Sequence, residues 1–315
     1  MVKRLALLFP GQGSQYVGMA KAAFDKSSSA QVLMKKANDL LGYDIQKIMF
    51  EGPEEKLKDT SVTQPALFLA SAMAWELLKD HDITHFDFAA GHSLGEYSAL
   101  YAAYALTFED GLTLVQERGK TMNEAGQQWP GTMAAIIGLP AKEVTELCDI
   151  VTKSVGICVP ANINSDTQIV ISGAKKAIEK ALELAKEKGA LKAIVLNVSG
   201  AFHSPLMSSA ARTMENVIKN ISISDAAVPV LTNVDAHATT NAGDIKKKLV
   251  QQIDHAVQWQ QTMIRLVELQ VETFIEVGAG RVLSNLMKKF DRKKAVFCTD
   301  DFEAIEKNLI ISSAQ

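Results

Sequence analysis

A Gly-His-Ser-Leu-Gly segment at residues 91–95 constrains the fold of this chain more than any other feature. Residues 86–90 form a short, partly apolar run that predicts a buried strand, and the Ala-, Leu- and Tyr-rich residues 94–106 predict a packed helix. A strand that turns directly into a helix strains the central residue, Ser93, and the two glycines keep the turn free of Cβ clashes. The helix N-terminus favours negative charge developing beside the Ser oxygen. The segment predicts a nucleophile elbow; the structural alternative is a small-residue turn that packs a helix on a strand.

Length and composition restrict the class of protein. A chain of 315 residues with 47% hydrophobic content can form one large domain, or a large domain with a smaller one inserted. The net charge of −3 argues against a general nucleic-acid binder. No apolar run is long enough to span a bilayer, so we expect a soluble, cytoplasmic protein with no membrane partner. A monomer is the expected state, because no long apolar stripe stands out.

The cysteines give no sign of a metal site or of a disulfide framework, since their spacing fits neither. We expect them to be buried thiols in a reducing compartment. They are Cys148, Cys158 and Cys298.

The order of expected elements indicates an α/β fold. Residues 5–9 predict a first buried strand, and further strands are expected at 228–232 and 272–277. Between the last two strands, residues from about 249 to 269 predict a helix, with His255 on its surface. The Gly-rich loop at 10–15 does not have the glycine spacing of a dinucleotide-binding site. Such a loop can bring a backbone N–H close to a substrate carbonyl, although a purely structural turn is the stronger interpretation of the loop alone.

The order of expected strands and helices changes between residues 127 and 197. The pattern there is strand, helix, two strands, helix and strand, which is typical of a split βαβ, ferredoxin-like unit. We therefore expect a small subdomain at 127–197 inserted into a large domain made of residues 1–126 and 198–315. The expected elements are strand 132–137, helix 141–151, strands 157–162 and 168–173, helix 174–188 and strand 191–197.

An exposed Ser becomes a good nucleophile only when a base takes its proton, and His is the usual base. Of the six histidines, His203 lies in a Gly/Ser/Pro loop just past the expected subdomain boundary, where catalytic groups are favoured. His92 directly precedes Ser93, so its side chain should point to the opposite side. The remaining four lie in surroundings expected to be exposed: His81, His85, His237 and His255. His203 is therefore the preferred base, with a buried structural His as the alternative.

Eight segments in this order make the chain resemble the malonyl-CoA:acyl-carrier-protein transacylase family of fatty acid synthesis. Each segment is a modest signal, but the series runs nearly end to end and is highly specific. The resemblance implies an α/β-hydrolase-like core with an inserted ferredoxin-like subdomain. The segments are FPGQGSQ (9–15), TQPAL (63–67), GHSLGEYSAL (91–100), QERGKTM (116–122), GTMAAIIGL (131–139), SGAFHSPLM (199–207), VQW (257–259) and EVGAG (276–280).

The resemblance also implies roles for residues at the reaction centre. Ser93 would be the acylated nucleophile and His203 its base. The backbone N–H groups of Gln12 and Leu94 would form the oxyanion hole, which gives the Gly-rich loop a function.

Further residues would recognise the substrate or orient the base. Arg118, which alone would be read as solvated helix surface, would pair its planar fork with the malonyl carboxylate. The carbonyl of Gln252 would orient the histidine in place of a triad acid, with Gln251 as the neighbouring alternative in the alignment. Gln64 and Asn162 would line the same pocket.

The implied reaction moves a malonyl group from malonyl-CoA to the phosphopantetheine thiol of an acyl carrier protein through a malonyl-serine, with no metal or bound cofactor. Carriers in the family are typically acidic. The cationic residues 281–294 are therefore a candidate docking surface, with a solvated helix face as the alternative. The lysines proposed for docking are Lys188, Lys192, Lys288 and Lys289.

Three other functions are compatible with parts of the pattern. An esterase or thioesterase shares Gly-x-Ser-x-Gly, but it would have no use for a buried Arg118, and a clear triad acid is missing. A trans-acting malonyl acyltransferase of a polyketide pathway would use the same residues on a different carrier. A catalytically dead scaffold is disfavoured, because the Ser, His and Arg are all present.

Overall fold

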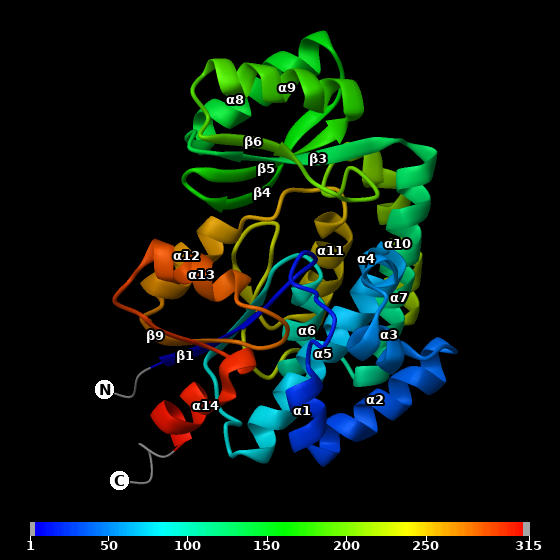
Figure 1. Ribbon diagram of the computed structural model, residues 1–315, viewed down its shortest axis with the longest axis vertical. Helices are drawn as coiled ribbons and strands as arrows, with labels where there is room; N and C mark the ends of the chain where they lie inside the picture. The colour runs from blue at the N-terminus through cyan, green and yellow to red at the C-terminus, as the bar shows by residue number, and fades with distance from the viewer. Residues whose placement is uncertain (1–3, 311–315) are drawn as a thin grey trace.

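The computed structural model describes residues 4–310, which form two β-sheets with helices packed around them (Figure 1). The larger sheet has the strand order β10-β9-β1-β2-β7-β8. All neighbouring strands in it are parallel except β7 and β8. Its strands are β1 (Arg4–Phe9), β2 (Phe88–Gly91), β7 (Val230–Leu231), β8 (Ala238–Thr239), β9 (Val271–Glu276) and β10 (Ala295–Cys298).

The central strand β1 is covered on both faces, which explains its continuous apolar sequence. Leu7 and Phe9 face one core, together with helices α5 and α7, whereas Ala6 and Leu8 face a second core with α12 and α13. Alternate side chains of a strand point to opposite faces, so a parallel sheet covered on both sides needs apolar residues at every position. These helices are α5 (Thr60–Asp80), α7 (Phe108–Gln128), α12 (Trp259–Glu268) and α13 (Val282–Phe290).

Other helices complete the large part of the molecule. The small N-terminal helices gather beside α5, at the lower right in Figure 1. They are α1 (Lys21–Lys26), α2 (Ser28–Leu41), α3 (Ile45–Glu51) and α4 (Glu54–Lys58). Later in the chain come α6 (Gly95–Ala102), η1 (Pro205–Met207), α10 (Ser208–Asn220), α11 (Ala242–Gln252), η2 (Thr299–Asp301), α14 (Phe302–Ile305) and η3 (Glu306–Ile310).

The smaller sheet is antiparallel, with strand order β4-β5-β3-β6, and stands above the larger one in Figure 1. Its order and its two helices are those of the ferredoxin-like pattern predicted from the sequence. A separate apolar core lies between these helices and the sheet. The elements are β3 (Gly131–Ile137), α8 (Ala141–Ser154), β4 (Cys158–Ser165), β5 (Gln168–Ala174), α9 (Lys175–Glu187) and β6 (Lys192–Val195).

The predicted fold class is confirmed, whereas one predicted helix is wrong. The sequence indicated a continuous helix from about Leu249 to Leu269, but α11 ends at Gln252 and α12 begins at Trp259. Between them, Val257 donates its N–H to Ala161 of β4 (2.8 Å) and accepts from Ile163 (2.9 Å). The smaller sheet thus takes the backbone groups that a helix would have used. The exposed His255 lies in this connection and not on a helix.

Within residues 4–310, no helix combines the length and the apolar character needed to cross a membrane. The same residues contain no cluster of His, Cys, Asp or Glu side chains suited to a metal ion. The three cysteines are free thiols and buried. The predicted division of the chain at residues 126/127 and 197/198 stays a prediction; the elements of the smaller sheet begin at Gly131 and end at Val195.

Candidate active site

Ser93 lies in the turn between β2 and α6, at the carboxyl edge of the larger sheet. Its φ of 53° is in the left-handed region that non-glycine residues rarely adopt. A Cβ at Gly91 would collide with the backbone of Gly95, and a Cβ at Gly95 would collide with the carbonyl of Phe9 in β1. Both glycines are therefore required for the turn to form, and α6 begins in direct contact with the central strand.

His203 lies against Ser93, in the loop that leads from the smaller sheet into η1. Its Nε2 is 2.8 Å from Ser93 Oγ, and its Nδ1 is 2.7 Å from the carbonyl oxygen of Gln252. A carbonyl oxygen can only accept a hydrogen bond, so Nδ1 carries the proton and Nε2 accepts from the Ser93 hydroxyl. This is the arrangement of a nucleophile, a base and a group that orients the base, with a backbone carbonyl in the place of a carboxylate.

The surroundings of His203 keep its imidazole neutral. Burial, and next the positive charge of Arg118, lower the pKa of His203 to about 3. A neutral imidazole can accept the Ser93 proton at physiological pH. The other histidines do not contact Ser93 Oγ; His92, for example, points to the smaller sheet, where its Nε2 is 2.9 Å from Asn164 Oδ1.

Arg118 extends from α7 into the same site and is 1% exposed. Its Nη2 donates to Ser93 Oγ and to Gln252 Oε1, both at 3.0 Å, and its Nη1 donates to Gln64 Oε1 at 2.8 Å. Its Nε has no hydrogen-bond partner in the part of the chain that the structure describes. Within the described residues, no carboxylate lies at ion-pair distance from this guanidinium. The site therefore holds a buried cation whose contacts are all neutral groups.

Two backbone N–H groups close to Ser93 in the fold have no hydrogen-bond acceptor among the described residues. Gln12 follows β1 and Leu94 follows Ser93, and the backbone link from His92 N to Phe9 O (3.0 Å) holds the two loops together. In the described part of the chain, neither the N–H of Gln12 nor that of Leu94 makes a hydrogen bond. The Gln12 side chain instead donates to Thr60 Oγ1 at 3.2 Å. The geometry leaves both N–H groups available to a developing oxyanion.

The remaining residue from the sequence prediction is less closely connected. Asn162 lies on β4, and its buried Oδ1 has no hydrogen-bond partner among residues 4–310. The structure thus joins five predicted side chains by contact, but it links Asn162 to none of them through a hydrogen bond. The five are Ser93, His203, Arg118, Gln252 and Gln64.

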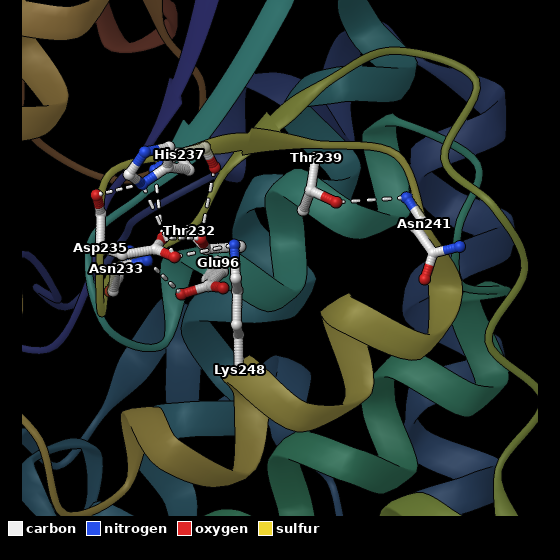
Figure 2. Close-up of polar contacts among 8 residues, drawn as sticks. All are labelled: Glu96, Thr232, Asn233, Asp235, His237, Thr239, Asn241 and Lys248. Carbon is white, nitrogen blue, oxygen red and sulfur yellow. Dashed lines mark hydrogen bonds and ion pairs between the residues drawn. The ribbon is translucent and has the colours of Figure 1, made fainter.

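Two further residues of the site escaped the sequence prediction. Asn233 follows β7, and its Oδ1 accepts from the Ser93 N–H at 2.6 Å. Glu96 lies on α6 and is buried beside it, accepting from the Asn233 N–H at 3.1 Å (Figure 2). The position of Asn233 directly after an expected strand was a usable signal, since the carboxyl ends of adjacent parallel strands meet at one edge of the sheet.

Comparison with known proteins assigns the chain to a family. The acyl transferase domain family matches residues 6–298. The malonyl CoA-acyl carrier protein transacylase of Bacillus subtilis is 45% identical over 305 residues, which cover 97% of this chain and 96% of the relative. This chain belongs to the malonyl-CoA:acyl carrier protein transacylase family. The transacylase FabD of Acinetobacter baumannii has the same fold, with a TM-score of 0.94 at 37% identity, covering 99% of this chain and 100% of that one.

Another transacylase of known structure was solved with a carrier. It is a malonyl-transacylase in complex with the acyl carrier protein of a type II polyketide synthase, with a TM-score of 0.89 at 37% identity and 94% of each chain covered.

The low pKa of His203 predicts how the reactivity of Ser93 depends on pH. An uncharged serine reagent such as a sulfonyl fluoride should modify Ser93 equally fast at pH 8 and pH 5, because a group with a pKa of about 3 stays neutral over this range. Arg118→Gln removes a positive charge that lowers the pKa of His203. As the pH falls, Ser93 of this variant should therefore lose reactivity at a higher pH than Ser93 of the wild type. Mass spectrometry of the modified protein gives the rates. A wild-type rate that halves near pH 6.5 would show that His203 titrates as an ordinary histidine.

Proposed function

We propose that this protein transfers the malonyl group of malonyl-CoA to the phosphopantetheine thiol of an acyl carrier protein. The observation that carries the proposal is the buried guanidinium of Arg118, which touches the nucleophile Ser93 and, among residues 4–310, has no carboxylate at ion-pair distance. A buried, unpaired charge is costly, and a guanidinium matches a carboxylate with two parallel hydrogen bonds. The malonyl carboxylate is the missing partner, and in binding there it would bring its thioester carbonyl beside Ser93.

The first half of the reaction acylates the serine. Ser93 Oγ attacks the thioester carbonyl while His203 Nε2 takes its proton, and the N–H groups of Gln12 and Leu94 stabilise the tetrahedral oxyanion. The carbonyl of Gln252, which accepts from His203 Nδ1, stabilises the imidazolium. His203 returns the proton to the leaving coenzyme A thiolate, which leaves a malonyl ester on Ser93.

The second half releases the ester to the carrier. The phosphopantetheine thiol enters where coenzyme A left, gives its proton to His203 and attacks the malonyl-serine carbonyl. The same two N–H groups bind the second oxyanion, and Ser93 leaves with the proton from His203. Because the donor leaves before the acceptor enters, the kinetics are ping-pong.

We infer fatty acid synthesis as the setting, since the relatives bear the name of the transacylase that acts on acyl carrier protein. We also propose the cytoplasm as the compartment. The complex with a polyketide carrier shows that a protein of this fold also serves that class of carrier. We infer a monomer. Gln64, which bonds Arg118, and Asn162, with its unpartnered Oδ1, would complete the substrate pocket.

Intact-protein mass spectrometry tests the proposed function. Brief incubation with malonyl-CoA should add one malonyl group to the wild-type protein and none to Ser93→Ala. Addition of a holo fatty acid carrier should then move the group to the carrier. An adduct that decays to free malonate without any carrier would instead favour a hydrolase, and transfer only to a polyketide carrier would change the pathway.

Replacement of Arg118 tests carboxylate recognition. Arg118→Ala should lower kcat/KM for malonyl-CoA by roughly 10- to 100-fold, because hydrogen bonds to charged groups contribute about 1.5–3 kcal/mol. Acetyl-CoA has no carboxylate, so kcat/KM for acetyl-CoA should fall less. The ratio of kcat/KM for malonyl-CoA to that for acetyl-CoA should therefore decrease. Arg118→Lys keeps the positive charge without the planar fork, so its kcat/KM for malonyl-CoA should lie between those of the wild type and Arg118→Ala. Malonyl turnover that is indifferent to Arg118→Ala would overturn the assignment.

The proposed docking surface for the carrier consists of Lys188 and Lys192 near β6, and Lys288 and Lys289 at the end of α13. All four are exposed, and within residues 4–310 none of them has an ion-pair partner. The last two line a hollow of about 520 Å³, whose other lining residues are Asn285, Arg292 and Lys294. An acidic carrier would be attracted to unpaired cations of this kind.

Charge reversal tests this surface. Lys288→Glu with Lys289→Glu should lower kcat/KM for the carrier about tenfold and weaken its salt dependence, because steering by opposite charges would be lost. Malonyl loading of Ser93 should be unchanged. The matched control reverses the adjacent pair Lys175 and Lys176 at the start of α9, which are exposed and likewise have no ion-pair partner within residues 4–310. Equal effects of the two pairs would place the docking surface elsewhere.

A further inference from the structure

The strained turn at Ser93 is held by a side chain that takes no part in the reaction described above. Asn233 Oδ1 accepts from the Ser93 N–H, and Asn233 Nδ2 donates to the carbonyl of Gly91, both at 2.6 Å. The side-chain amide of Asn233 therefore connects Gly91, the last residue of β2, to the nucleophile Ser93. Asn233 is 0% exposed, so no water competes for these hydrogen bonds.

A second buried group sets the orientation of the Gln252 amide. Glu96 Oε2 accepts from Gln252 Nε2 at 2.7 Å and from the Asn233 N–H at 3.1 Å. Gln252 Nε2 also donates to the Ser93 carbonyl at 2.9 Å. With its NH₂ group bound on that side, the amide must direct Oε1 at Arg118, which donates to it at 3.0 Å. Burial raises the pKa of Glu96 to about 7, so a neutral side chain can occupy the position.

The loop that carries Asn233 is fixed from outside as well. Thr232 Oγ1 donates to Asp235 Oδ1 at 2.7 Å, and Asp235 Oδ2 is 2.9 Å from Lys248 Nζ (Figure 2). Lys248 and Gln252 are four residues apart on α11, which places them on the same face of that helix. Helix α11 thus holds the loop through Lys248 at the surface and, through Gln252 and Glu96, in the interior.

We propose that Asn233 and Glu96 are positioning residues of the transacylase, Asn233 for the nucleophile and Glu96, through Gln252, for the guanidinium of Arg118. The proposal rests on the proposed function, because it assumes that Arg118 binds the malonyl carboxylate. It assigns the two residues different effects on the kinetics. Loss of Asn233 affects the attack by Ser93 on every acyl donor, whereas loss of Glu96 affects the binding of donors that carry a carboxylate.

Single-turnover acylation of Ser93 by malonyl-CoA and acetyl-CoA separates these effects, since it gives a maximal rate and a half-saturating concentration for each donor. Glu96→Ala should raise the half-saturating concentration of malonyl-CoA about tenfold, which corresponds to the cost of one unmade buried hydrogen bond. The half-saturating concentration of acetyl-CoA should stay within about threefold of the wild-type value. Glu96→Gln keeps an acceptor oxygen and should restore malonyl binding. Asn233→Ala should lower the maximal rate about tenfold or more for both donors.

Controls separate positioning from stability. Ser98→Ala on α6 removes a buried hydroxyl that has no hydrogen-bond partner within the described residues, and it should behave as wild type. Asn233→Asp keeps the acceptor for Ser93 and loses the donor to Gly91, so a slow maximal rate is expected even where Asn233→Ala does not fold.

Wild-type kinetics in Asn233→Asp would overturn the role of Asn233. Equal losses for both donors in Glu96→Ala would overturn the role of Glu96. Malonyl uptake by Ser93→Ala would instead refute the proposed function.

Discussion

The site depends on the close approach of α6 to the central strand of the larger sheet. Gly95 lies against the carbonyl of Phe9, a contact that no side chain would allow. This contact places Ser93 where the ends of β1 and β2 meet, within reach of loops from distant parts of the chain. The left-handed backbone at Ser93 is a local cost, and the surrounding hydrogen bonds hold the residue in that conformation.

The charge balance of the site follows from what surrounds Arg118. Amide and hydroxyl oxygens satisfy part of its hydrogen-bonding capacity without neutralising its charge. This positive charge helps to keep His203 in its neutral, basic form, and in the proposed function it would bind an acyl group that brings its own carboxylate. In this proposal a single cation, Arg118, serves both the base and the selection of the donor. A carboxylate in place of the Gln252 carbonyl would put a negative charge beside His203 and would raise the pKa of its imidazole.

Local sequence patterns predicted most strands, the ferredoxin-like subdomain and the nucleophile elbow, because each depends on residues that are close in the chain. The role of Arg118 came only from the resemblance, since a mixed helix sequence does not reveal which face is buried. The break between α11 and α12 was missed because Val257 pairs with β4, about a hundred residues away in the sequence. Glu96 and Asn233 were missed for the same reason, as their contacts join α6, α11 and the loop after β7.

Gln252 acts on the two halves of the site through different parts of one residue. Its main-chain carbonyl orients His203, and its side-chain amide orients Arg118. Every amino acid supplies a carbonyl, so mutation at this position leaves the partner of the base in place while it changes the surroundings of the guanidinium. Evolution can therefore vary the acyl group that such an enzyme accepts without first rebuilding its proton-transfer chemistry. A carboxylate triad couples these two properties more tightly, because its acid is itself a mutable side chain.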